Sequence, residues 1–293
     1  MTGDVATVLP ENRPLRTAIV YDFDGTLARG NIPEHTFIPE LGMKPNEFWA
    51  EVKRQAEKHD ADEILTYMRL MVEQSEQREV PITRKFLQAH GANTPLFEGV
   101  PEWFDRIDTY AAERGLALEH YVVSSGILEM IRGCAIFGKF KKVFASTFIY
   151  DAEGRAVWPA VAVNYTNKTQ FLFRINKGVM NSWENDPVNR WIPMEERPLP
   201  FSRFIFIGDG DTDIPSMKMV HLQGGQAIAV FDPERWQPGK SQKNIYRLIA
   251  EDRVRFVAPA DYQEGTQLDV IVRGILGRFA REGGYRVPDE AAR

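Results

Sequence analysis

The sequence contains 293 residues and carries a net charge of −5. This length can hold one large α/β core and a smaller accessory unit. The acidic balance argues against nucleic acid as the main partner, because a phosphate backbone calls for a basic protein face. The sequence also lacks a run of about 18 uncharged apolar residues, which argues against a membrane span and a membrane partner.

The N-terminal residues and the cysteine content suggest the compartment. Residues 1–16 lack a basic start followed by an apolar stretch, so they do not look like a secretory signal, and we expect a loose leader there. The single cysteine, Cys134, has no partner for an internal disulfide. We therefore predict a cytoplasmic protein in which Cys134 is a buried apolar residue rather than a reactive thiol.

The first predicted strand covers residues 18–21 and runs into two carboxylates, Asp22 and Asp24, and then Gly25. Its apolar composition is typical of a strand buried on both faces of a parallel sheet, where chemistry gathers at the carboxyl ends. Side chains two residues apart can point to the same site. Two such carboxylates repel each other unless a cation, a proton or a reaction needs them, although Asp-x-Asp-Gly can also be a simple polar turn.

Residues 29–96 are predicted to form a separate helical unit. Helices are expected over 47–58 and 61–77 from the spacing of apolar residues, and over 82–89, before Gly91. Its Met and aromatic residues are predicted to form a core of their own. Four polar residues at the start of the unit could contact a substrate or simply be solvated: Arg29, Asn31, Glu34 and His35.

The chain is expected to return to the core near residue 97 through a helix over 102–114. A strand over 120–123 then ends at Ser124 and Ser125. Either hydroxyl could bond a phosphoryl oxygen, and either could cap the helix that follows.

A strand, turn and strand are predicted over 143–163, and a helix over 169–176. Lys168, just before that helix, would bring a compact ammonium group to a negative site, and Lys177 at its far end is the alternative. Residues 181–200 contain four prolines and form a long irregular insertion, which could contact a substrate, the helical unit or a second subunit.

A second apolar strand, over 204–207, also ends in glycine and acid, Gly208-Asp209-Gly210-Asp211-Thr212-Asp213. Two strands with acidic ends suggest one shared divalent-cation site, because Mg²⁺ takes one or two carboxylates together with phosphate and water. Strands over 227–231 and 254–258 and a helix over 268–280 complete the prediction. Residues 282–293 are expected to be a frayed tail.

Four segments in this order resemble the motifs of the haloacid dehalogenase-like hydrolase superfamily, whose commonest members are Mg²⁺-dependent phosphatases. They are Asp22-Phe23-Asp24-Gly25-Thr26, Tyr121-Val122-Val123-Ser124-Ser125-Gly126, Thr166-Asn167-Lys168 and Gly208 to Asp213. The resemblance implies a Rossmann-like, doubly wound α/β core over 17–28 and 97–281. It implies a helical cap over 29–96, a layout similar to phosphoserine phosphatases and pyrimidine nucleotidases.

The resemblance also implies roles for single residues. Asp22 would attack phosphorus to form an aspartyl phosphate, and Asp24 would protonate the leaving oxygen and then deprotonate water. The implied metal ligands are Asp22, Asp24 through its carbonyl oxygen, and Asp209, with Asp213 holding metal waters or Lys168. The implied phosphate ligands are Ser124, Lys168, Gly25 and Thr26. The family pattern favours Ser124 over Ser125 and Lys168 over Lys177.

The sequence therefore predicts a Mg²⁺-dependent phosphatase acting on a small phosphorylated metabolite. By resemblance, the acid at Asp24 indicates phosphate esters rather than carbon–halogen bonds, since a leaving halide needs no proton. A phosphotransferase or mutase using the same aspartyl phosphate is an alternative. A catalytically silent binding protein is disfavoured because Asp22, Asp24, Lys168 and Asp209 are all present. Substrate identity and oligomeric state stay open.

Overall fold

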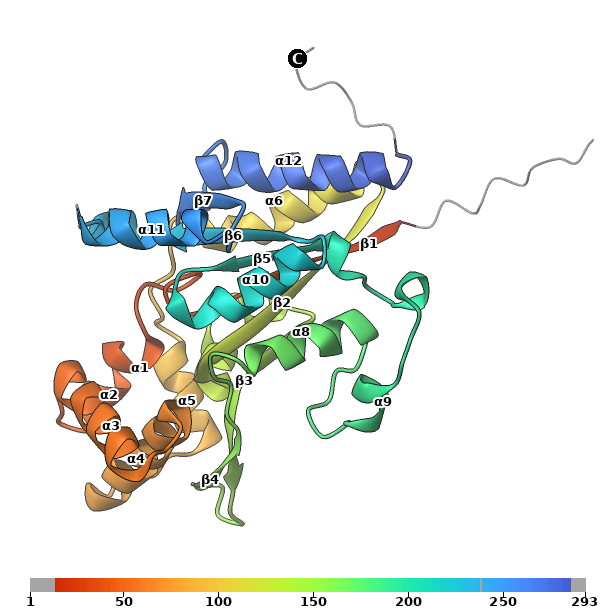
Figure 1. Cartoon of the computed structure of the whole chain (residues 1–293). Coiled ribbons are helices and arrows are strands. Elements are labelled where there is room, and N and C mark those ends of the chain that lie inside the picture. Colours follow the sequence, from red (N-terminus) through yellow and green to blue (C-terminus); the bar gives the residue numbers. More distant parts are fainter. Residues whose placement is uncertain (1–13, 238, 286–293) are drawn as a thin grey trace, which may run out of the picture.

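A central sheet organises the molecule (Figure 1). The computed structural model describes residues 14–237 and 239–285, and within them the sheet has seven strands in the order β4-β3-β2-β1-β5-β6-β7. The strands are β1 (Leu15–Tyr21), β2 (Leu116–Ile127), β3 (Lys142–Tyr150), β4 (Ala156–Val161), β5 (Phe204–Gly208), β6 (Gln226–Phe231) and β7 (Phe256–Pro259). All neighbours are parallel except β3 and β4, which are antiparallel. The predicted α/β fold is confirmed.

The sheet is buried on both faces, as the apolar strands predict. Along β1, Ala18 and Val20 belong to one hydrophobic cluster while Ile19 and Tyr21 belong to the other, and all four are fully buried. Alternate side chains of a strand point to opposite faces, so one short apolar run contributes to two cores.

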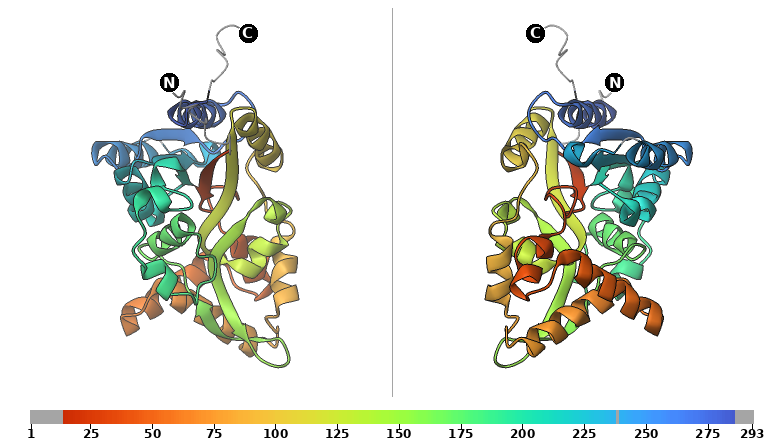
Figure 2. Two further views of the ribbon diagram at one scale, coloured as in Figure 1. Left: turned by 90° about the vertical axis from the view of Figure 1, so that its right-hand side faces the viewer. Right: turned by 90° about the vertical axis from the view of Figure 1, so that its left-hand side faces the viewer.

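Helices cover both faces of the sheet (Figure 2). The helices α6 (Val100–Ala112) and α12 (Gln267–Glu282) pack on the face of Ile19, and α8 (Lys168–Lys177), α10 (Ile214–Leu222) and α11 (Lys240–Ala250) pack on the face of Ala18. Helices α10 and α11 were not among the predicted elements. Helix α11 follows a segment with Pro and Gly, and its apolar residues are confined to its second half, residues 245–250.

The segment between β1 and α6 is helical, as predicted. Its helices are α1 (Ile32–His35), α2 (Phe37–Glu40), α3 (Pro45–His59), α4 (Glu63–Gln77) and α5 (Arg84–Gly91). Asp62 caps α4 by accepting a hydrogen bond from the Leu65 amide at 2.9 Å. The two ends of the segment are joined at its neck, where the Phe97 amide donates to the Leu27 carbonyl at 3.0 Å.

Two of the contacts that join this helical segment to the core involve its backbone. Helix α5 crosses α7 (Leu128–Gly133) at a pair of glycines: a Cβ at Gly91 would lie 1.8 Å from the Met130 carbonyl oxygen, and one at Gly133 would lie 1.9 Å from that of Gln88. The β3–β4 hairpin, the predicted excursion, also reaches the segment, because the Ala156 amide donates to the Ile82 carbonyl at 2.8 Å. The hairpin and the helices lie together in Figure 1.

The insertion over 181–200 packs beside α8 and contains α9 (Asp186–Asn189). The guanidinium of Arg174 on α8 donates to the carbonyl oxygens of Asn181, Ser182 and Glu184 at 2.7 to 2.9 Å. The irregular backbone is therefore held by a buried cation of the core. Of the possibilities raised by the sequence, a contact with the cavity is not observed, since none of the described lining residues belongs to this insertion.

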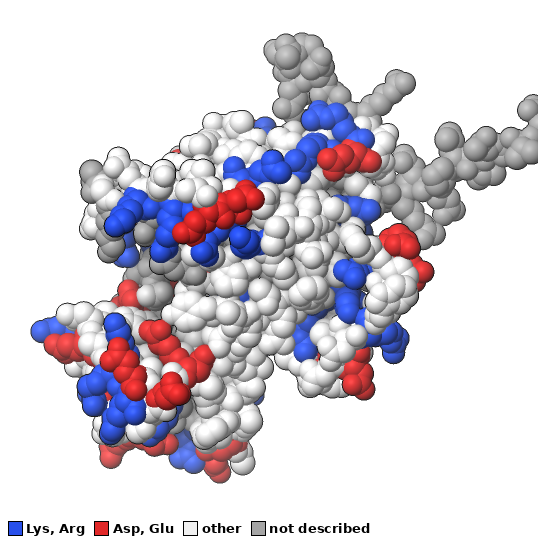
Figure 3. All heavy atoms as spheres, viewed as in Figure 1, with Lys and Arg blue, Asp and Glu red and all other residues white. Residues whose placement is uncertain are grey.

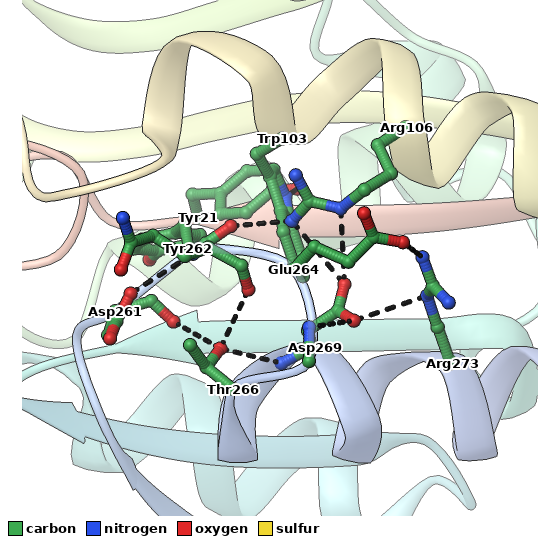
Figure 4. A network of polar contacts seen from close by, with 11 residues as sticks. Tyr21, Trp103, Arg106, Asp261, Tyr262, Glu264, Thr266, Asp269 and Arg273 are labelled. Atoms are coloured by element: carbon green, nitrogen blue, oxygen red, sulfur yellow. Dashed lines mark hydrogen bonds and ion pairs between the residues drawn. The ribbon is translucent and has the colours of Figure 1, made fainter.

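A polar network behind β1 supports the loop that carries the first motif (Figure 4). Tyr262 donates its hydroxyl proton to the Thr26 carbonyl at 2.9 Å, and the Arg106 guanidinium donates to the Tyr262 carbonyl at 2.5 Å. Arg106 also pairs with the buried Asp269 of α12 at 3.4 Å. At the last residue of β1, the hydroxyl of Tyr21 accepts a hydrogen bond from the Trp103 indole at 2.8 Å.

The predicted loose ends need two corrections. Strand β1 begins at Leu15, so residues 15 and 16 belong to the sheet, where Arg16 pairs with Glu119 of β2 at 3.0 Å. At the other end, Tyr285 packs against the core rather than fraying. Residues 1–13 and 286–293 lie outside the described residues.

The surface seen in Figure 3 carries acidic and basic side chains interspersed over the helical segment. Among the described residues, no helix is long and apolar enough to cross a bilayer.

Candidate active site

The acidic motifs meet at the carboxyl edge of the sheet. Strand β1 pairs with β2 on one side and with β5 on the other, and Tyr21 lies opposite both Val122 and Ile207. This register places Asp22, Ser124 and Asp209 at the same edge, although they are far apart in the sequence. The predicted convergence of the first, second and fourth motifs is observed.

Asp22 and Lys168 form the centre of this edge. One carboxylate oxygen of Asp22 accepts the Phe23 amide at 2.7 Å, and the other lies 3.0 Å from the ammonium of Lys168. The same ammonium donates to Asp213 at 2.8 Å. Burial acts to lower the pKa of Lys168, but the carboxylates of Asp213 and Asp22 outweigh it and raise the pKa. Lys168 is thus a fully buried cation held between two acids.

The local sequence explains how Lys168 reaches this place. Asn164 and Asn167 close a turn, the amide of each donating to the side-chain oxygen of the other at 2.7 and 3.1 Å. Helix α8 begins directly after this turn, at Lys168. Lys177, the alternative, lies at the opposite end of α8 and donates to the carbonyl oxygens of Val188 and Arg190. The structure brings Lys168 to the acids, and not Lys177.

Three acids gather closely enough to hold a metal ion. Asp22, Asp209 and Asp213 each offer a carboxylate oxygen, and these atoms lie within 4.8 Å of one another. Burial and the charge of Asp22 raise the pKa of Asp213 to about 7, and burial followed by the charges of Asp22 and Asp213 raises the pKa of Asp209 well above its usual range. One oxygen of Asp213 is buried without a hydrogen-bond partner among the described residues. The three carboxylates outnumber the single ammonium of Lys168 that is paired with them, and a set of oxygen ligands of this kind fits Mg²⁺.

Asp24 is held apart from the three-acid group. One of its oxygens accepts the Ile32 amide at 3.0 Å, so its side chain faces the beginning of α1. Burial and the nearby charge of Asp22 raise the pKa of Asp24 to about 7. A carboxyl group with this pKa can donate and accept a proton near neutrality. The metal-ligand role that the resemblance implies for the Asp24 carbonyl oxygen stays a prediction.

Two glycines let the backbone approach these acids. A Cβ at Gly126 would lie 2.7 Å from an Asp24 carboxylate oxygen and 3.3 Å from the Ser124 hydroxyl. Gly25 has a φ of +73°, and its Cβ would lie 2.2 Å from a carboxylate oxygen of Asp209. Any side chain at either position would displace a carboxylate.

The predicted phosphate ligands are placed unequally. Ser124 is buried, borders the cavity and accepts the Gly126 amide at 3.0 Å rather than capping α7. Ser125 also borders the cavity. Gly25 borders it too, but its amide already donates to the Ala28 carbonyl at 2.8 Å. Thr26 is not among the described residues that line the cavity.

A cavity of about 620 Å³ lies over the acids, between the helical segment and the carboxyl edge. Of the four polar residues suggested at the start of that segment, only Asn31 is among the described lining residues. Arg29 pairs with Asp232 at 3.6 Å and with Glu234 at 3.1 Å. The other two are engaged nearby: Glu34 accepts the Trp49 indole proton at 2.7 Å, and the His35 ring lies 2.7 Å from the Arg29 carbonyl.

Sequence reasoning missed most of the cavity wall. From the helical segment the wall includes Trp49, Glu63, Ile64 and Tyr67, and from the core it includes Phe97, Tyr165, Phe231, Asp232 and Arg235. The aromatic residues of the segment were predicted to be core, and Tyr67 is indeed buried. Helical spacing identifies a buried stripe, but only packing shows which end of the stripe borders a cavity.

Comparison with known proteins agrees with this geometry. The family model of haloacid dehalogenase-like hydrolases matches residues 19–218. An uncharacterized protein of Borreliella burgdorferi is 28% identical over 282 residues, covering 86% of this chain and 93% of its own length.

Solved structures show the same fold. A HAD family hydrolase from Salmonella enterica serovar Typhi has a TM-score of 0.57 at 15% identity, covering 89% of this chain and 72% of its own. A phosphoserine phosphatase with a phospho-aspartyl intermediate analogue has a TM-score of 0.53 at 16% identity, covering 89% and 99%. A substrate-bound phosphoserine phosphatase complex has a TM-score of 0.53 at 14% identity, covering 88% and 98%. The predicted family and the predicted phosphoserine phosphatase-like layout are confirmed, and this chain belongs to the haloacid dehalogenase-like hydrolases.

Proposed function

We propose that this protein is a Mg²⁺-dependent phosphatase that hydrolyses the phosphate monoester of a small metabolite through an aspartyl phosphate on Asp22. One observation carries the proposal: Asp22 belongs to the three-acid group and also pairs with the buried ammonium of Lys168 at 3.0 Å. A carboxylate in this position stands beside the cations that an incoming phosphate needs.

The first step would use Asp22 and Asp24. A carboxylate oxygen of Asp22 attacks phosphorus, the bond from phosphorus to the leaving oxygen breaks, and Asp24 transfers its proton to that oxygen. The raised pKa of Asp24, about 7, supports a protonated carboxyl at the start of this step.

The second step would regenerate the enzyme. Asp24, now ionised, removes a proton from water, the resulting oxygen attacks phosphorus, and the bond to Asp22 breaks to release inorganic phosphate. Ser124 and Lys168 would bind the phosphoryl oxygens throughout, since both are buried at the same edge. Asp22, Asp209, Asp213 and the Asp24 carbonyl would hold Mg²⁺, which when bound offsets the repulsion between the carboxylate and the phosphate.

The test measures phosphate released from a panel of phosphate monoesters by purified protein, with Mg²⁺ and with a chelator. We expect Mg²⁺-dependent release that Asp22→Asn abolishes without loss of folded structure, because the amide has a similar shape but is far less nucleophilic. Asp186→Asn, an exposed acid on α9, serves as the matched control and should keep full activity.

The possible outcomes separate the hypotheses. Near-normal turnover by folded Asp22→Asn protein would remove Asp22 from the mechanism. Phosphate transferred to an added alcohol, in place of released phosphate, would instead assign a phosphotransferase that uses the same covalent intermediate.

A further inference from the structure

The residues of the cavity wall indicate what kind of leaving group the phosphate ester carries. Five of the described lining residues are aromatic: Trp49, Tyr67, Phe97, Tyr165 and Phe231. The cavity volume of about 620 Å³ also falls within the range of roughly 300–1,000 Å³ that is typical for binding a whole organic ligand. The wall therefore has room and apolar surface for a leaving group considerably larger than the phosphate.

Trp49 is fixed within this wall. Its indole nitrogen donates to Glu34 at 2.7 Å, and its ring centroid lies 5.4 Å from that of Tyr67, with the ring planes tilted by 52°. Glu34 also accepts a hydrogen bond from the side-chain amide of Asn31 at 2.6 Å. Because its one polar atom is occupied, the indole offers the cavity an apolar, planar surface.

Tyr67 adds an unused polar group to the cavity that Asp22 and Asp24 also line. Its side chain is 3% exposed, yet its hydroxyl has no hydrogen-bond partner among the described residues. Burial raises the pKa of Tyr67, and the charge of Asp24 raises it further, so the hydroxyl keeps its proton. A buried donor left without a partner costs about 1–3 kcal/mol, which a ligand acceptor would recover.

The charged residues of the wall already have protein partners. Glu63 accepts the Tyr165 hydroxyl at 2.9 Å. Asp232 lies 3.6 Å from Arg29 and 3.7 Å from Arg235. Glu63 and Arg235 are also exposed, so neither supplies the desolvated charge that would favour a zwitterionic leaving group such as serine.

These observations converge on the leaving group, and the inference rests on the proposed phosphatase function. We propose that Trp49, Ile64 and Tyr67 form the leaving-group site, and that the substrate is the phosphate monoester of an uncharged alcohol that bears a planar ring. The ring packs on Trp49 and Ile64, and the Tyr67 hydroxyl donates a hydrogen bond to an oxygen of the phosphate ester.

The test compares kcat/KM, with Mg²⁺ present, for benzyl phosphate, ethyl phosphate and phosphoserine. Benzyl and ethyl alcohol are similar leaving groups, so a difference between their esters reports on ring binding. We expect benzyl phosphate to be preferred over both others by roughly 10- to 100-fold, the range that apolar pocket contacts supply.

Two conservative variants separate ring packing from hydrogen bonding. Trp49→Leu keeps an apolar side chain and should bring benzyl and ethyl phosphate to near equality. Tyr67→Phe keeps the ring and should lower kcat/KM roughly 10-fold for both esters, as expected for one lost hydrogen bond. Trp191→Ala removes an indole that is 81% exposed and should leave all three values unchanged. Thermal unfolding of each variant establishes that it is folded.

The outcomes distinguish this inference from the function on which it rests. Mg²⁺-dependent hydrolysis without a ring preference, or with a preference for phosphoserine that Trp49→Leu does not alter, would overturn the leaving-group site and keep the phosphatase. No hydrolysis of any ester would reject the phosphatase function and the leaving-group site together.

Discussion

At the scale of single residues, the site is a balance of buried charge. Lys168 contributes the one fully buried ammonium among the described residues. Its partners Asp22 and Asp213 follow the carboxyl ends of two different strands, β1 and β5. Burying a charge is costly unless it is paired, and here each member compensates the others. The lysine is therefore expected to support both the fold and the chemistry.

We predict that Lys168→Met lowers the free energy of unfolding by about 3–5 kcal/mol, because it leaves two buried carboxylates without their cation. Urea unfolding in metal-free buffer at pH 7 measures this change. Lys177→Met is the matched control on the same helix. Since Lys177 is half-buried and bonds only carbonyl oxygens, its loss should cost about 1 kcal/mol. Equal effects of the two variants would contradict the special role of Lys168.

At the scale of elements, glycine contacts decide how the helical segment sits on the core. At the crossing of α5 and α7, Gly91 and Gly133 each face backbone carbonyl groups of the other helix. A backbone atom cannot rotate away as a side chain can, so a methyl group must push the helices apart. The position of the cavity wall depends on this crossing, because Trp49 and Tyr67 belong to the same segment.

Gly133→Ala is predicted to lower the free energy of unfolding by about 1–3 kcal/mol through overpacking. Gly274→Ala provides the control, since Gly274 is exposed on α12 and a Cβ there meets nothing within 4 Å. That change should raise stability by up to about 1 kcal/mol through helix propensity. Urea unfolding curves of the two variants test the opposite signs, and a neutral Gly133→Ala would mean that the crossing is loose.

The ion pair at the start of β1 makes the stability of the protein depend on pH. Arg16 donates to both oxygens of Glu119, at 3.0 and 3.2 Å, and Lys141 donates to it at 2.7 Å. Burial acts to raise the pKa of Glu119, but the hydrogen bonds from Arg16, Lys141 and Tyr121 outweigh it and lower the pKa. A lowered folded pKa adds stability above the unfolded pKa, and this is lost as the pH falls through the folded pKa.

Arg16→Gln should therefore destabilise the protein by on the order of 1 kcal/mol at pH 7, where Glu119 is ionised. The difference from the unmodified protein should shrink as the pH is lowered below about 4.3, the usual pKa of glutamate. Denaturant unfolding at several pH values measures it. Lys218→Gln, at an exposed lysine of α10, is the control and should show no such trend. A pH-independent effect of Arg16→Gln would exclude the ion pair as its cause.

At the scale of the whole molecule, the acids of the site come from two distant parts of the chain, and a bound cation would tie these parts together. Asp22 follows β1, whereas Asp209 and Asp213 follow β5. Burial, followed by the repulsion between these carboxylates, raises the pKa values of Asp209 and Asp213. Metal binding and folding are thus expected to be linked.

Mg²⁺ is predicted to raise the thermal midpoint, with about 2.7 kcal/mol of added stability at one hundred times its dissociation constant. Asp209→Asn should remove most of this shift, because it deletes one of the three clustered carboxylates. Thermal unfolding with Mg²⁺, with a chelator and with sodium chloride at matched ionic strength separates specific binding from screening. A shift that Asp209→Asn retains would place the ion elsewhere.

Much of the fold and the site could be predicted from local patterns. Apolar strands that end in acid, and helices with apolar residues at regular spacing, appear in the structure where they were expected, within a few residues at the ends. The failures have identifiable causes. Arg16 and Thr17 interrupt the apolar pattern at the start of β1, so residues 15 and 16 were not predicted as strand. The apolar residues of α11 are confined to residues 245–250, a stretch too short to predict a helix by its spacing.

The sequence by itself determined the α/β class, the family and the pair of acidic strand ends, because continuous apolar runs and the order of the motifs can be read directly along the chain. Only the tertiary structure placed Lys168, and not Lys177, against the acids. It also engaged Arg29, Glu34 and His35 with other protein groups, and it placed Trp49 and Tyr67 in the wall of the cavity over the acids. Those outcomes depend on which surfaces meet when the helical segment packs on the sheet. Such contacts join residues far apart in the chain and leave no periodic signal.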